Sequence, residues 1–521
     1  MDIICKIKIV TQCKRIKGFY TVLFLFCCLG GYAQYFSELY NNKGSAIEFG
    51  SIKEQNGNYY VTGATFSKSG QTYYEKALFD KIYQDGSTDS IIVLIDSDQY
   101  SYEIYFNTLK KTADGNFIAA GDMIDTTGKV FMMKVDTNGK ILLWQKYTYP
   151  GEDLFHGQDI IEVPGQGYLI AANINFTIGS KSDVLIIRTD TSGNVLNQRL
   201  YSAGNAEWPW VIRSMTNGDY MVGACSVKDN TNTPYWAKTW LIEINNLGNE
   251  VRNWLDTDNK TMWPWGMTQT VDEGWILTRW YIASDSDDYQ VYKASILKLD
   301  SALQKVWEIR FSDSTSYNST LYDVEQLADG NFIACGIEPV WGGDSANLYG
   351  WLVKLNIDST IIWENRILAV SRFGTQSFLY DINELPNGDL LACGELDYTY
   401  DVGITPIQQG WILRTDSNGC LLDQCWLGVN DVNPPDAIEV KEYPNPATNE
   451  IIFETGDEGK PTTITIYNLL GQKVMVSLSN HESKLDNPLK VETGLWQQGV
   501  YIWQARQDGY PVGQGKVEVI R

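Results

Sequence analysis

Two short segments of the chain repeat one aromatic pattern, Trp208-Pro209-Trp210 and Trp263-Pro264-Trp265. Indole rings have flat apolar faces and one N–H donor, so grouped indoles can stack on sugar rings or on peptide side chains. The 521 residues include only two histidines, His156 and His481. This scarcity disfavours histidine-based catalysis and multi-histidine metal sites. The residue types therefore indicate binding, and we expect no metal and no cofactor.

The composition restricts the partners and the fold. The chain has 64 acidic and 41 basic residues and a formal charge of −23, whereas nucleic acids and anionic lipids need partners rich in Lys and Arg. With 44% hydrophobic and 20% charged residues the chain is globular. Its length exceeds one ordinary core and predicts several domains or one large repeat architecture.

A sevenfold repeat provides the elements that position the aromatic residues. A polar glycine turn precedes an anchor residue and a run of aliphatic side chains, as in Asp114-Gly-Asn-Phe117-Ile-Ala. The anchors recur every 51 to 58 residues, at Tyr59, Phe117, Tyr168, Tyr220, Trp275, Phe332 and Leu390. A second hairpin lies between successive anchors, so each unit contains about four antiparallel strands. Seven such units predict an all-β fold, a seven-bladed β-propeller over residues 35–429, with an all-β solenoid as the alternative.

Most of the candidate ligand-binding residues occupy two repeat positions, which lie twelve and ten residues before each anchor and which we call positions −12 and −10. Position −12 holds Ile47, Tyr105, His156, Trp208, Trp263, Thr320 and Phe378. Position −10 holds Phe49, Asn107, Gln158, Trp210, Trp265, Tyr322 and Tyr380. Alternate residues of a strand share a face, so both positions should circle one face of the ring. We predict a ligand-binding surface at Trp208, Trp210, Trp263, Trp265, Tyr322, Tyr380 and His156, with packing between blades as the alternative.

The sequence isolates no catalytic residue. Acidic residues in the long connections could supply a carboxylate pair for glycoside cleavage: Asp153, Glu207, Asp285, Asp287, Asp288 and Asp344. A Ser-His-Asp or Cys-His site would have to use His156, because His481 lies in a separate domain. A secreted hydrolase or lyase that uses loop carboxylates is therefore the alternative to a binding protein.

Other repeat positions have structural explanations. Three residues after the anchor the side chain is small, so Cys335 and Cys393 are predicted to be core residues. A turn position holds Tyr83, Asp136, Asp190, Asn245, Asp300, Asn356 and Asp416, where Asp and Asn are expected to cap the turn, with calcium ligation as the alternative. Cys420 and Cys425 are predicted to form a disulfide, and pairing among Cys225, Cys335 and Cys393 is left open.

The two ends of the chain have distinct roles. Residues 1–34 are predicted to be a signal peptide, with basic Lys14, Arg15 and Lys17 before an apolar run. That run is about half the ~20 residues of a membrane span, so the mature chain is expected to have no transmembrane segment. Lipidation at Cys28 is an alternative. Residues 35–40 resemble the strand that follows each turn, and we predict that they form the outer strand of the last blade and close the ring.

The last part of the chain has a different pattern. After a linker at residues 430–437 it contains, in order, Tyr443, Pro444, Asn445 and Pro446, then Gly471, then Gly499 and Tyr501, and finally Lys516. In these motifs residues 438–521 closely resemble the C-terminal sorting domain of type A cargo of the type IX secretion system of Bacteroidota. The resemblance implies a small C-terminal β-sandwich recognised by the outer-membrane translocon. A carbohydrate-binding sandwich is the alternative.

Together these features predict an exported protein that passes through the periplasm and is secreted or held at the cell surface. Its partners are expected to be the type IX translocon and a glycan or protein ligand, without nucleic acid, and it is expected to be a monomer.

Overall fold

The computed structural model describes residues 36–40, 46–69, 72–84, 86–88, 92–93, 103–124, 128–150, 154–174, 182–227, 237–258, 260–286, 289–311, 318–342, 345–369, 375–398, 407–421, 440–455, 462–468, 473–479, 489–494, 496, 498–507 and 510–520. All 36 elements of these ranges are β-strands. The described part contains no helix with the length and apolar character that a membrane crossing requires. The predicted signal peptide and linker lie outside the described residues.

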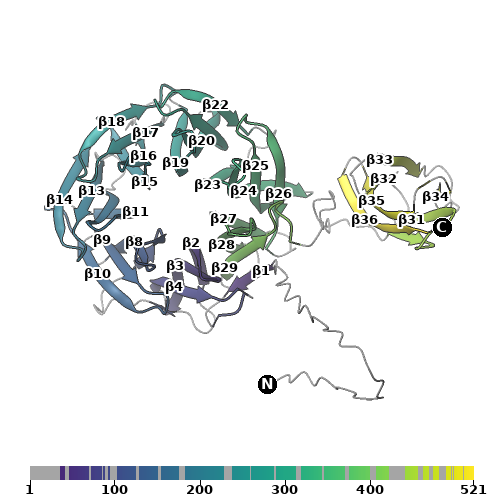
Figure 1. Ribbon diagram of the computed structural model, residues 1–521, viewed down its shortest axis with the longest axis horizontal. Coiled ribbons are helices and arrows are strands. Elements are labelled where there is room, and N and C mark those ends of the chain that lie inside the picture. The colour runs from purple at the N-terminus through teal and green to yellow at the C-terminus, as the bar shows by residue number, and fades with distance from the viewer. Residues whose placement is uncertain are drawn as a thin grey trace, which may run out of the picture. The chain divides into compact units, whose positions relative to one another are not determined.

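Seven antiparallel blades surround a central axis (Figure 1). The first contains β2 (Ala46–Gln55), β3 (Asn58–Ser69), β4 (Thr72–Ile82) and β5 (Ile92–Val93). The second contains β6 (Glu103–Phe106), β7 (Lys110–Lys111), β8 (Phe117–Ile124), β9 (Gly128–Val135) and β10 (Ile141–Tyr147). The third contains β11 (Leu154–Val163), β12 (Gly167–Ile174), β13 (Asp183–Thr189) and β14 (Val195–Tyr201).

The remaining blades follow the same order. The fourth contains β15 (Ala206–Ser214), β16 (Tyr220–Val227), β17 (Ala237–Ile244) and β18 (Glu250–Leu255). The fifth contains β19 (Thr261–Gln269), β20 (Trp275–Ser286), β21 (Tyr289–Leu299) and β22 (Lys305–Arg310). The sixth contains β23 (Thr320–Gln326), β24 (Phe332–Gly342), β25 (Ser345–Leu355) and β26 (Ile361–Ile367). The seventh contains β27 (Thr375–Glu384), β28 (Leu390–Tyr398), β29 (Ile407–Thr415) and β1 (Phe36–Tyr40).

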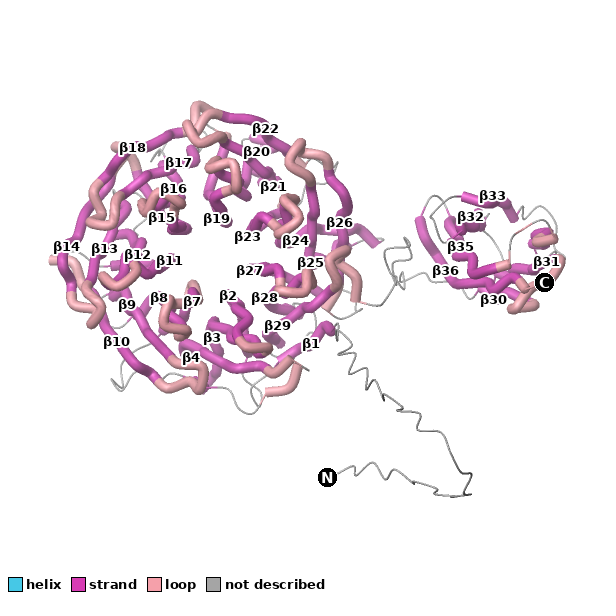
Figure 2. The backbone as a smooth tube through the Cα atoms, in the orientation of Figure 1, coloured by secondary structure: helices cyan, strands magenta, loops and turns pink. Residues whose placement is uncertain are grey.

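The first strand in sequence of each of blades one to six lies nearest the axis and the last lies on the perimeter (Figure 2). The seventh blade differs because its outer strand comes from the other end of the ring. Strand β1 pairs antiparallel with β29, with Phe36 opposite Arg414 and Tyr40 opposite Gly410. The seven-bladed propeller and its predicted closure by residues 35–40 are thus confirmed for the described strand Phe36–Tyr40.

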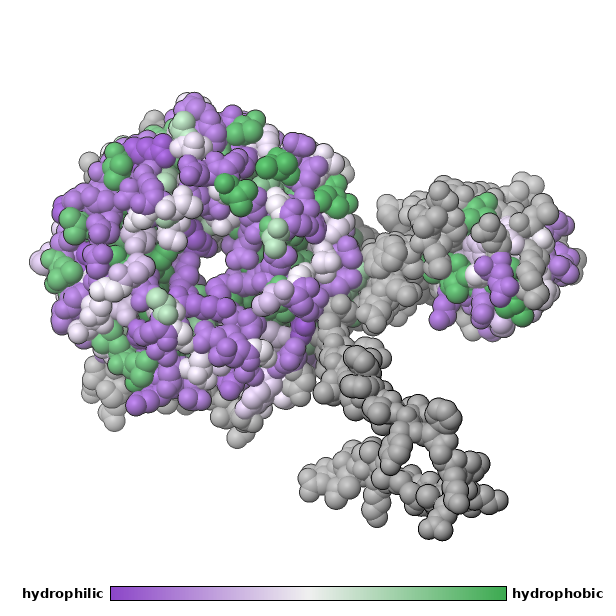
Figure 3. Space-filling model, viewed as in Figure 1, coloured by the Kyte–Doolittle hydropathy of each residue, from purple (hydrophilic) through white to green (hydrophobic). Residues whose placement is uncertain are grey.

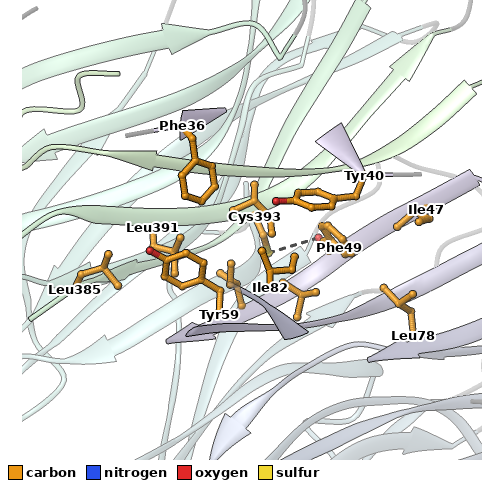
Figure 4. Close-up of a cluster of buried hydrophobic side chains, with 13 residues drawn as sticks. Phe36, Tyr40, Ile47, Phe49, Tyr59, Leu78, Ile82, Leu385, Leu391 and Cys393 are labelled. Carbon is orange, nitrogen blue, oxygen red and sulfur yellow. Dashed lines mark hydrogen bonds between the residues drawn. The ribbon is translucent and has the colours of Figure 1, made fainter. Parts of the chain in front are cut away.

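Buried side chains fill the spaces between neighbouring blades. Between the last and the first blade, Phe36 and Tyr40 of β1 pack with Leu391 and Cys393 of β28 and with Phe49 of β2 (Figure 4). Both β1 rings are less than one-tenth exposed. The Tyr40 hydroxyl also donates to the carbonyl oxygen of Gly86 at 2.8 Å. Side-chain burial and a hydrogen bond therefore fasten β1 from both sides.

The predicted turn caps are present. The carboxylate of Asp136 accepts hydrogen bonds from the backbone N–H groups of Asn138 at 2.8 Å and Lys140 at 2.9 Å. The same pair of bonds recurs at Asp190, Asn245, Asp300, Asn356 and Asp416. The prediction that Asp and Asn cap these turns is confirmed at six of the seven positions, and Tyr83 is the exception.

The cysteines of the ring are core residues, as predicted for Cys335 and Cys393. Cys225, Cys335 and Cys393 are buried and free, and burial raises the pKa of each thiol. Cys420 is disulfide-bonded. Cys425 lies outside the described residues, so the Cys420–Cys425 pair stays a prediction.

Two sheets form the C-terminal β-sandwich. One consists of β30 (Val440–Tyr443), β31 (Glu450–Thr455) and β34 (Leu489–Glu492). The other consists of β32 (Thr462–Asn468), β33 (Lys473–Ser479), β35 (Gly499–Gln507) and β36 (Tyr510–Val519). Phe453 of the first sheet and Trp503 of the second share one buried core.

The sorting motifs converge in this domain. The Asn445 side chain donates to the carbonyl oxygen of Lys516 at 2.7 Å and accepts from the backbone N–H of Glu518 at 3.0 Å. Tyr501 is buried against Trp496, while Tyr443 is exposed. Gly471 lies outside the described residues. The opening motif is thereby fixed to the last strand of the domain.

We expect β1 to determine the stability of the whole ring. Replacing Phe36 and Tyr40 together by Ala removes two buried rings and should lower the free energy of unfolding by at least about 3 kcal/mol. Guanidinium unfolding followed by tryptophan fluorescence measures this loss. Glu38→Ala changes the exposed side chain between them and should stay within about 0.5 kcal/mol of the unsubstituted protein. Equal stability of the double variant and the control would contradict closure by β1.

Candidate functional site

The innermost strands enclose a cavity of about 610 Å³ at the centre of the ring. Figure 3 shows an opening on the ring axis, bordered mostly by hydrophilic residues. The lining comes from all seven blades. Side chains from distant parts of the sequence therefore face one another across this space.

Four aromatic side chains form one side of the cavity, and we call them the aromatic wall: Trp210, Trp265, Tyr322 and Tyr380. They belong to blades four to seven and contact one another in order. The ring centroids of Trp210 and Trp265 are 4.4 Å apart, those of Trp265 and Tyr322 are 5.2 Å apart, and those of Tyr322 and Tyr380 are 5.0 Å apart. The Tyr380 hydroxyl donates to Glu395 at 2.7 Å, which fixes the end of the wall.

A bulge in each innermost strand presents these rings. In blades three to seven the antiparallel register skips the position −10 residue: Gln158, Trp210, Trp265, Tyr322 and Tyr380. It also skips His156 in blade three and residues 262 and 263 in blade five. A bulged residue is left out of the ladder and its side chain is re-aimed. Proline is tolerated beside the bulge in Trp-Pro-Trp because the innermost strand is a sheet edge. The position −10 residues of these five blades therefore line the cavity, and their role in ligand binding stays a prediction.

In the first blade, counting back from the anchor identifies the wrong residues. Its anchor, Tyr59, pairs with Glu54, five residues earlier, whereas the other six anchors pair with a residue six positions earlier. This hairpin is one residue shorter because Asn56 and Gly57 form a tight turn with positive φ of 53° and 76°. The predicted positions of Ile47 and Phe49 on the inner face are thus wrong: both are fully buried in the core.

Gly50 takes the place of an aromatic residue in the cavity lining of blade one. Blades two and three contribute the amides Asn107 and Gln158 instead. The cavity is therefore aromatic along blades four to seven and polar along blades two and three.

Two of the position −12 residues, Trp208 and Trp263, pack against the wall. Trp263 contacts Trp208, Trp210 and Trp265, with ring centroids 5.5 to 6.3 Å apart. Trp208 and Trp263 are half-buried, as the wall residues are, but neither is among the residues that line the cavity. These two indoles support the wall, which combines the binding and packing roles that the sequence left open.

His156 lies in a separate environment. Its Nδ1 is 2.9 Å from the carboxylate of Asp122, and it is not part of the cavity lining among the described residues. Burial lowers the pKa of His156, but the hydrogen bond and charge of Asp122 outweigh burial and leave that pKa raised. The structure thus does not bring His156 together with the aromatic wall.

Charged side chains form a second layer of the cavity, which we call the charged belt: Lys53, Lys110, Asp159, Arg213, Asp323, Glu325 and Asp381. Asp381 accepts from Lys53 at 2.9 Å and from the Ser51 hydroxyl at 2.6 Å. Asp159 accepts from Lys110 at 3.2 Å and from Arg213 at 2.7 Å. One ion-paired cluster therefore joins blades seven and one, and the other joins blades two, three and four.

The pKa values follow this pairing. Burial alone would raise the pKa values of Asp159 and Asp381, but their cationic partners and hydrogen bonds lower both. Burial, reinforced by Arg213, lowers the pKa of Lys110 to about 8. Burial raises the pKa values of Asp323 and Glu325 above their usual range, reinforced by the charge of Asp381 at Asp323 and by the charge of Asp323 at Glu325. Lys53 and Arg213 act on both carboxyls but offset this rise only in part.

The sequence analysis missed the charged belt. In each blade that contributes to it, a member of the charged belt lies one or three residues after the inward-facing residue, such as Asp381 after Tyr380 or Arg213 after Trp210. Simple alternation from a position −10 residue points to the side chain two residues later, such as Ile212 or Ile382, and both of these are buried in the core. The bulge instead places the side chains one and three residues later on the cavity face. The alignment error in the first blade also concealed Lys53, which corresponds to Lys110 and Arg213 in their blades.

The predicted loop carboxylates do not form a site among the described residues. Glu207 is buried and accepts hydrogen bonds from Asn205 at 2.8 Å and Ser226 at 3.1 Å. The side chain of Asp285 and the residues Asp153, Asp287, Asp288 and Asp344 lie outside the described set. Within the described ranges no three His, Cys, Asp or Glu side chains are grouped so that they could hold a metal ion.

One family model matches the chain. Residues 441–517 match the secretion system C-terminal sorting domain. This match supports the resemblance noted for residues 438–521. The protein is exported by the type IX secretion system and is either secreted or located at the cell surface. No curated protein matches the chain significantly.

Solved structures resemble the ring only distantly. A puromycin hydrolase is 9% identical with a TM-score of 0.45, and the match covers 78% of this chain and 58% of the hydrolase. An α-L-arabinanase of Penicillium chrysogenum is 12% identical with a TM-score of 0.37, over 57% of this chain and 89% of the enzyme. An α-L-arabinofuranosidase of Fusarium graminearum is 11% identical with a TM-score of 0.36, over 59% and 91%. The fold is established by the strand pairing of the seven blades and not by these likenesses.

Asp381→Asn should destabilise the ring at neutral pH, because it leaves the Lys53 ammonium without its carboxylate. We expect a loss of about 3 kcal/mol at pH 7. The pKa of Asp381 is lowered in the folded state, so its stabilising effect is present above the unfolded value of about 4 and is lost as pH falls through the folded value. The stability difference between the variant and the unsubstituted protein should therefore shrink in acid.

Thermal unfolding between pH 7 and pH 3 measures this dependence. Asp358→Asn removes an equivalent charge from an exposed turn and serves as the control. A difference that is absent at pH 7, or that widens in acid, would contradict the pairing.

Proposed function

We propose that the central cavity is a glycan-binding site and that the exported protein is a binding module. The observation that carries this proposal is the aromatic wall, four contacting rings along one side of a cavity of about 610 Å³. Cavities of a few hundred Å³ are the usual size for small-ligand sites. Flat rings offer stacking surface for the apolar faces of sugars.

The opposite side of the cavity supplies the complementary polar groups. Asn107 and Gln158 offer amide donors and acceptors, and Lys53 and Lys110 offer ammonium donors. A sugar has hydroxyl groups around its edge and C–H groups on its faces. Stacking on the wall would direct the hydroxyl groups toward these polar side chains. Lys53, Lys110 and Asn107 already have partners within the ring, but a flat apolar peptide surface would cover their remaining donors and acceptors without bonding to them, which costs free energy.

A hydrolase is the second candidate, and one observation favours it. Asp323 and Glu325 lie two residues apart on β23, line the same cavity as the wall, and have raised pKa values. Side chains two residues apart on a strand are about 7 Å apart, within the range of carboxyl separations in glycoside hydrolases. Release of reducing ends from bound oligosaccharides, lost in Glu325→Gln, would support this candidate.

The binding proposal predicts a specific loss. Trp210→Ala combined with Trp265→Ala removes half of the wall and should weaken glycan affinity by at least about 100-fold, since buried aromatic contacts each contribute about 2 kcal/mol or more at hot spots. A glycan array followed by calorimetry measures the loss. The melting temperature should fall only slightly, because both rings are partly exposed.

Trp254→Ala is the matched control, because this half-buried Trp lies on the perimeter strand β18 and is outside the cavity lining. Binding that survives in the double variant would overturn the proposal, as would the absence of any bound saccharide in an array of neutral, acidic and amino-substituted glycans.

A further inference from the structure

The charged belt has an unequal number of positive and negative groups. Lys53, Lys110 and Arg213 provide three cations, whereas Asp159, Asp323, Glu325 and Asp381 provide four carboxyls. All seven line the same cavity and come from every blade except the fifth. Asp159, Asp323 and Asp381 are buried, and the other four are half-buried. Since buried charges are stable only when paired, one carboxyl is left without a cation of its own.

The distances show where the imbalance lies. Lys53 forms an ion pair with Asp381 at 2.9 Å, and Arg213 forms an ion pair with Asp159 at 2.7 Å. Lys110 also contacts Asp159, at 3.2 Å. Among the described residues, Asp323 has only the outlying nitrogen of Arg213, at 3.9 Å, and the backbone N–H of Ile382, at 3.3 Å.

Glu325 is still less satisfied. Among the described residues, no hydrogen bond or ion pair reaches its carboxylate. The facing strands bring no further cation: β19 contributes Thr268 and Gln269 to the lining, and β27 contributes Tyr380 and Asp381. The vacant partner position therefore lies next to strand β23.

The aromatic wall borders the same strand. Tyr322 precedes Asp323 directly, and Trp265 and Tyr380 contact Tyr322 on either side at 5.2 and 5.0 Å. Faces and hydroxyl-bearing edges of such rings attract cations as well as sugar rings. A positively charged group beside Glu325 would thus meet carboxylates on one side and aromatic rings on the other.

We infer that Asp323 and Glu325 form a subsite for a positively charged group of the ligand, so that the cavity selects glycans that carry a protonated amine. This inference rests on the proposed glycan-binding function and specifies its ligand class. The ammonium supplies the missing cation of the belt while the sugar ring stacks on the aromatic wall. The N-acetylated form of the same sugar has the same shape around the ring but no charge, and it is discriminated against.

The test compares glucosamine oligosaccharides with their fully N-acetylated counterparts by calorimetry at pH 6.5. The free-amine oligomer should bind about tenfold or more tightly than the acetylated one, as expected for one charge-assisted hydrogen bond. Glu325→Gln should reduce this preference to below about twofold while changing the affinity for the acetylated oligomer little. Asp358→Asn, which removes a charge from an exposed turn, should keep the full preference.

A second probe separates the subsite from the glycan proposal. Choline and its neutral isostere 3,3-dimethylbutan-1-ol differ only in charge, and choline does not titrate. Tryptophan fluorescence should report choline binding that strengthens from pH 5 to pH 8, because Asp323 and Glu325 ionise as pH rises through their raised pKa values. The charged groups that face them are Lys53, Lys110, Asp159, Arg213 and Asp381. The pKa of Lys53 is raised and those of Asp159 and Asp381 are lowered, so these three keep their charge over this range, whereas Lys110, with a pKa of about 8, loses its proton only toward the upper end. The alcohol should show no such pH dependence.

Each outcome decides between the two proposals. Equal affinity for the two oligomers, or a preference that survives in Glu325→Gln, overturns the cation subsite and leaves glycan binding standing. Choline binding that depends on Glu325 without any glycan binding supports the subsite and overturns the glycan function. If neither the oligomers nor choline bind, both fall. Glu325→Gln is expected to fold, because it neutralises a carboxyl whose burial disfavours its charge, and its melting temperature at pH 8 checks this.

Discussion

A carboxylate that accepts a backbone N–H from the next blade holds the centre of this ring together. The innermost strand of each blade pairs along its length with one strand only, and β27 adds a single parallel bridge from Gln376 to Leu348 of β25. Most of its other edge therefore presents polar groups that must find partners. Asp159 accepts from Ile212 at 3.0 Å, Asp323 from Ile382 at 3.3 Å, and Asp381 from Ile52 at 2.8 Å. Each bond joins one blade to its successor. The convergence of seven sheet edges thereby creates the demand for acidic side chains at the axis.

The cations of the belt follow from these carboxylates. An enclosed carboxylate is costly unless a cation compensates it, and Lys53 and Arg213 provide that compensation for Asp381 and Asp159. The polar character of the cavity is therefore a consequence of how the blades are joined, and the aromatic wall is added to it by bulges at position −10. The same inner strands connect neighbouring blades and form the candidate binding surface. On β23, for example, Tyr322 belongs to the aromatic wall and the next residue, Asp323, accepts the hydrogen bond from Ile382 of the following blade.

Local repetition explains why much of the fold could be predicted from the sequence. The glycine turns, the capping Asp and Asn residues and the anchors are short-range patterns, and each encodes a hairpin that forms from its own residues. Position −10 was predictable in blades three to seven for the same reason. The first blade was misplaced because its hairpin lacks one residue, and a shift of one residue in a strand exchanges the two faces, so that Phe49 enters the core and Gly50 the cavity. The charged belt was missed because the bulge exchanges the two faces of each inner strand, and because its ion pairs join different blades: Lys110 and Asp159 are 49 positions apart and Lys53 and Asp381 are 328 positions apart.

The pairing of β1 with β29 brings the first and the last described strands of the ring together in one sheet. Phe36 and Arg414 are opposite one another in one sheet, so the path of the chain through the propeller is nearly circular. Six blades are each built from one continuous segment, and only the seventh is assembled from two. Which blade is divided depends solely on where the circle is interrupted. The fold is thus a candidate for circular permutation, in which new ends at a surface turn would transfer the divided blade to another place in the ring without altering the inner strands.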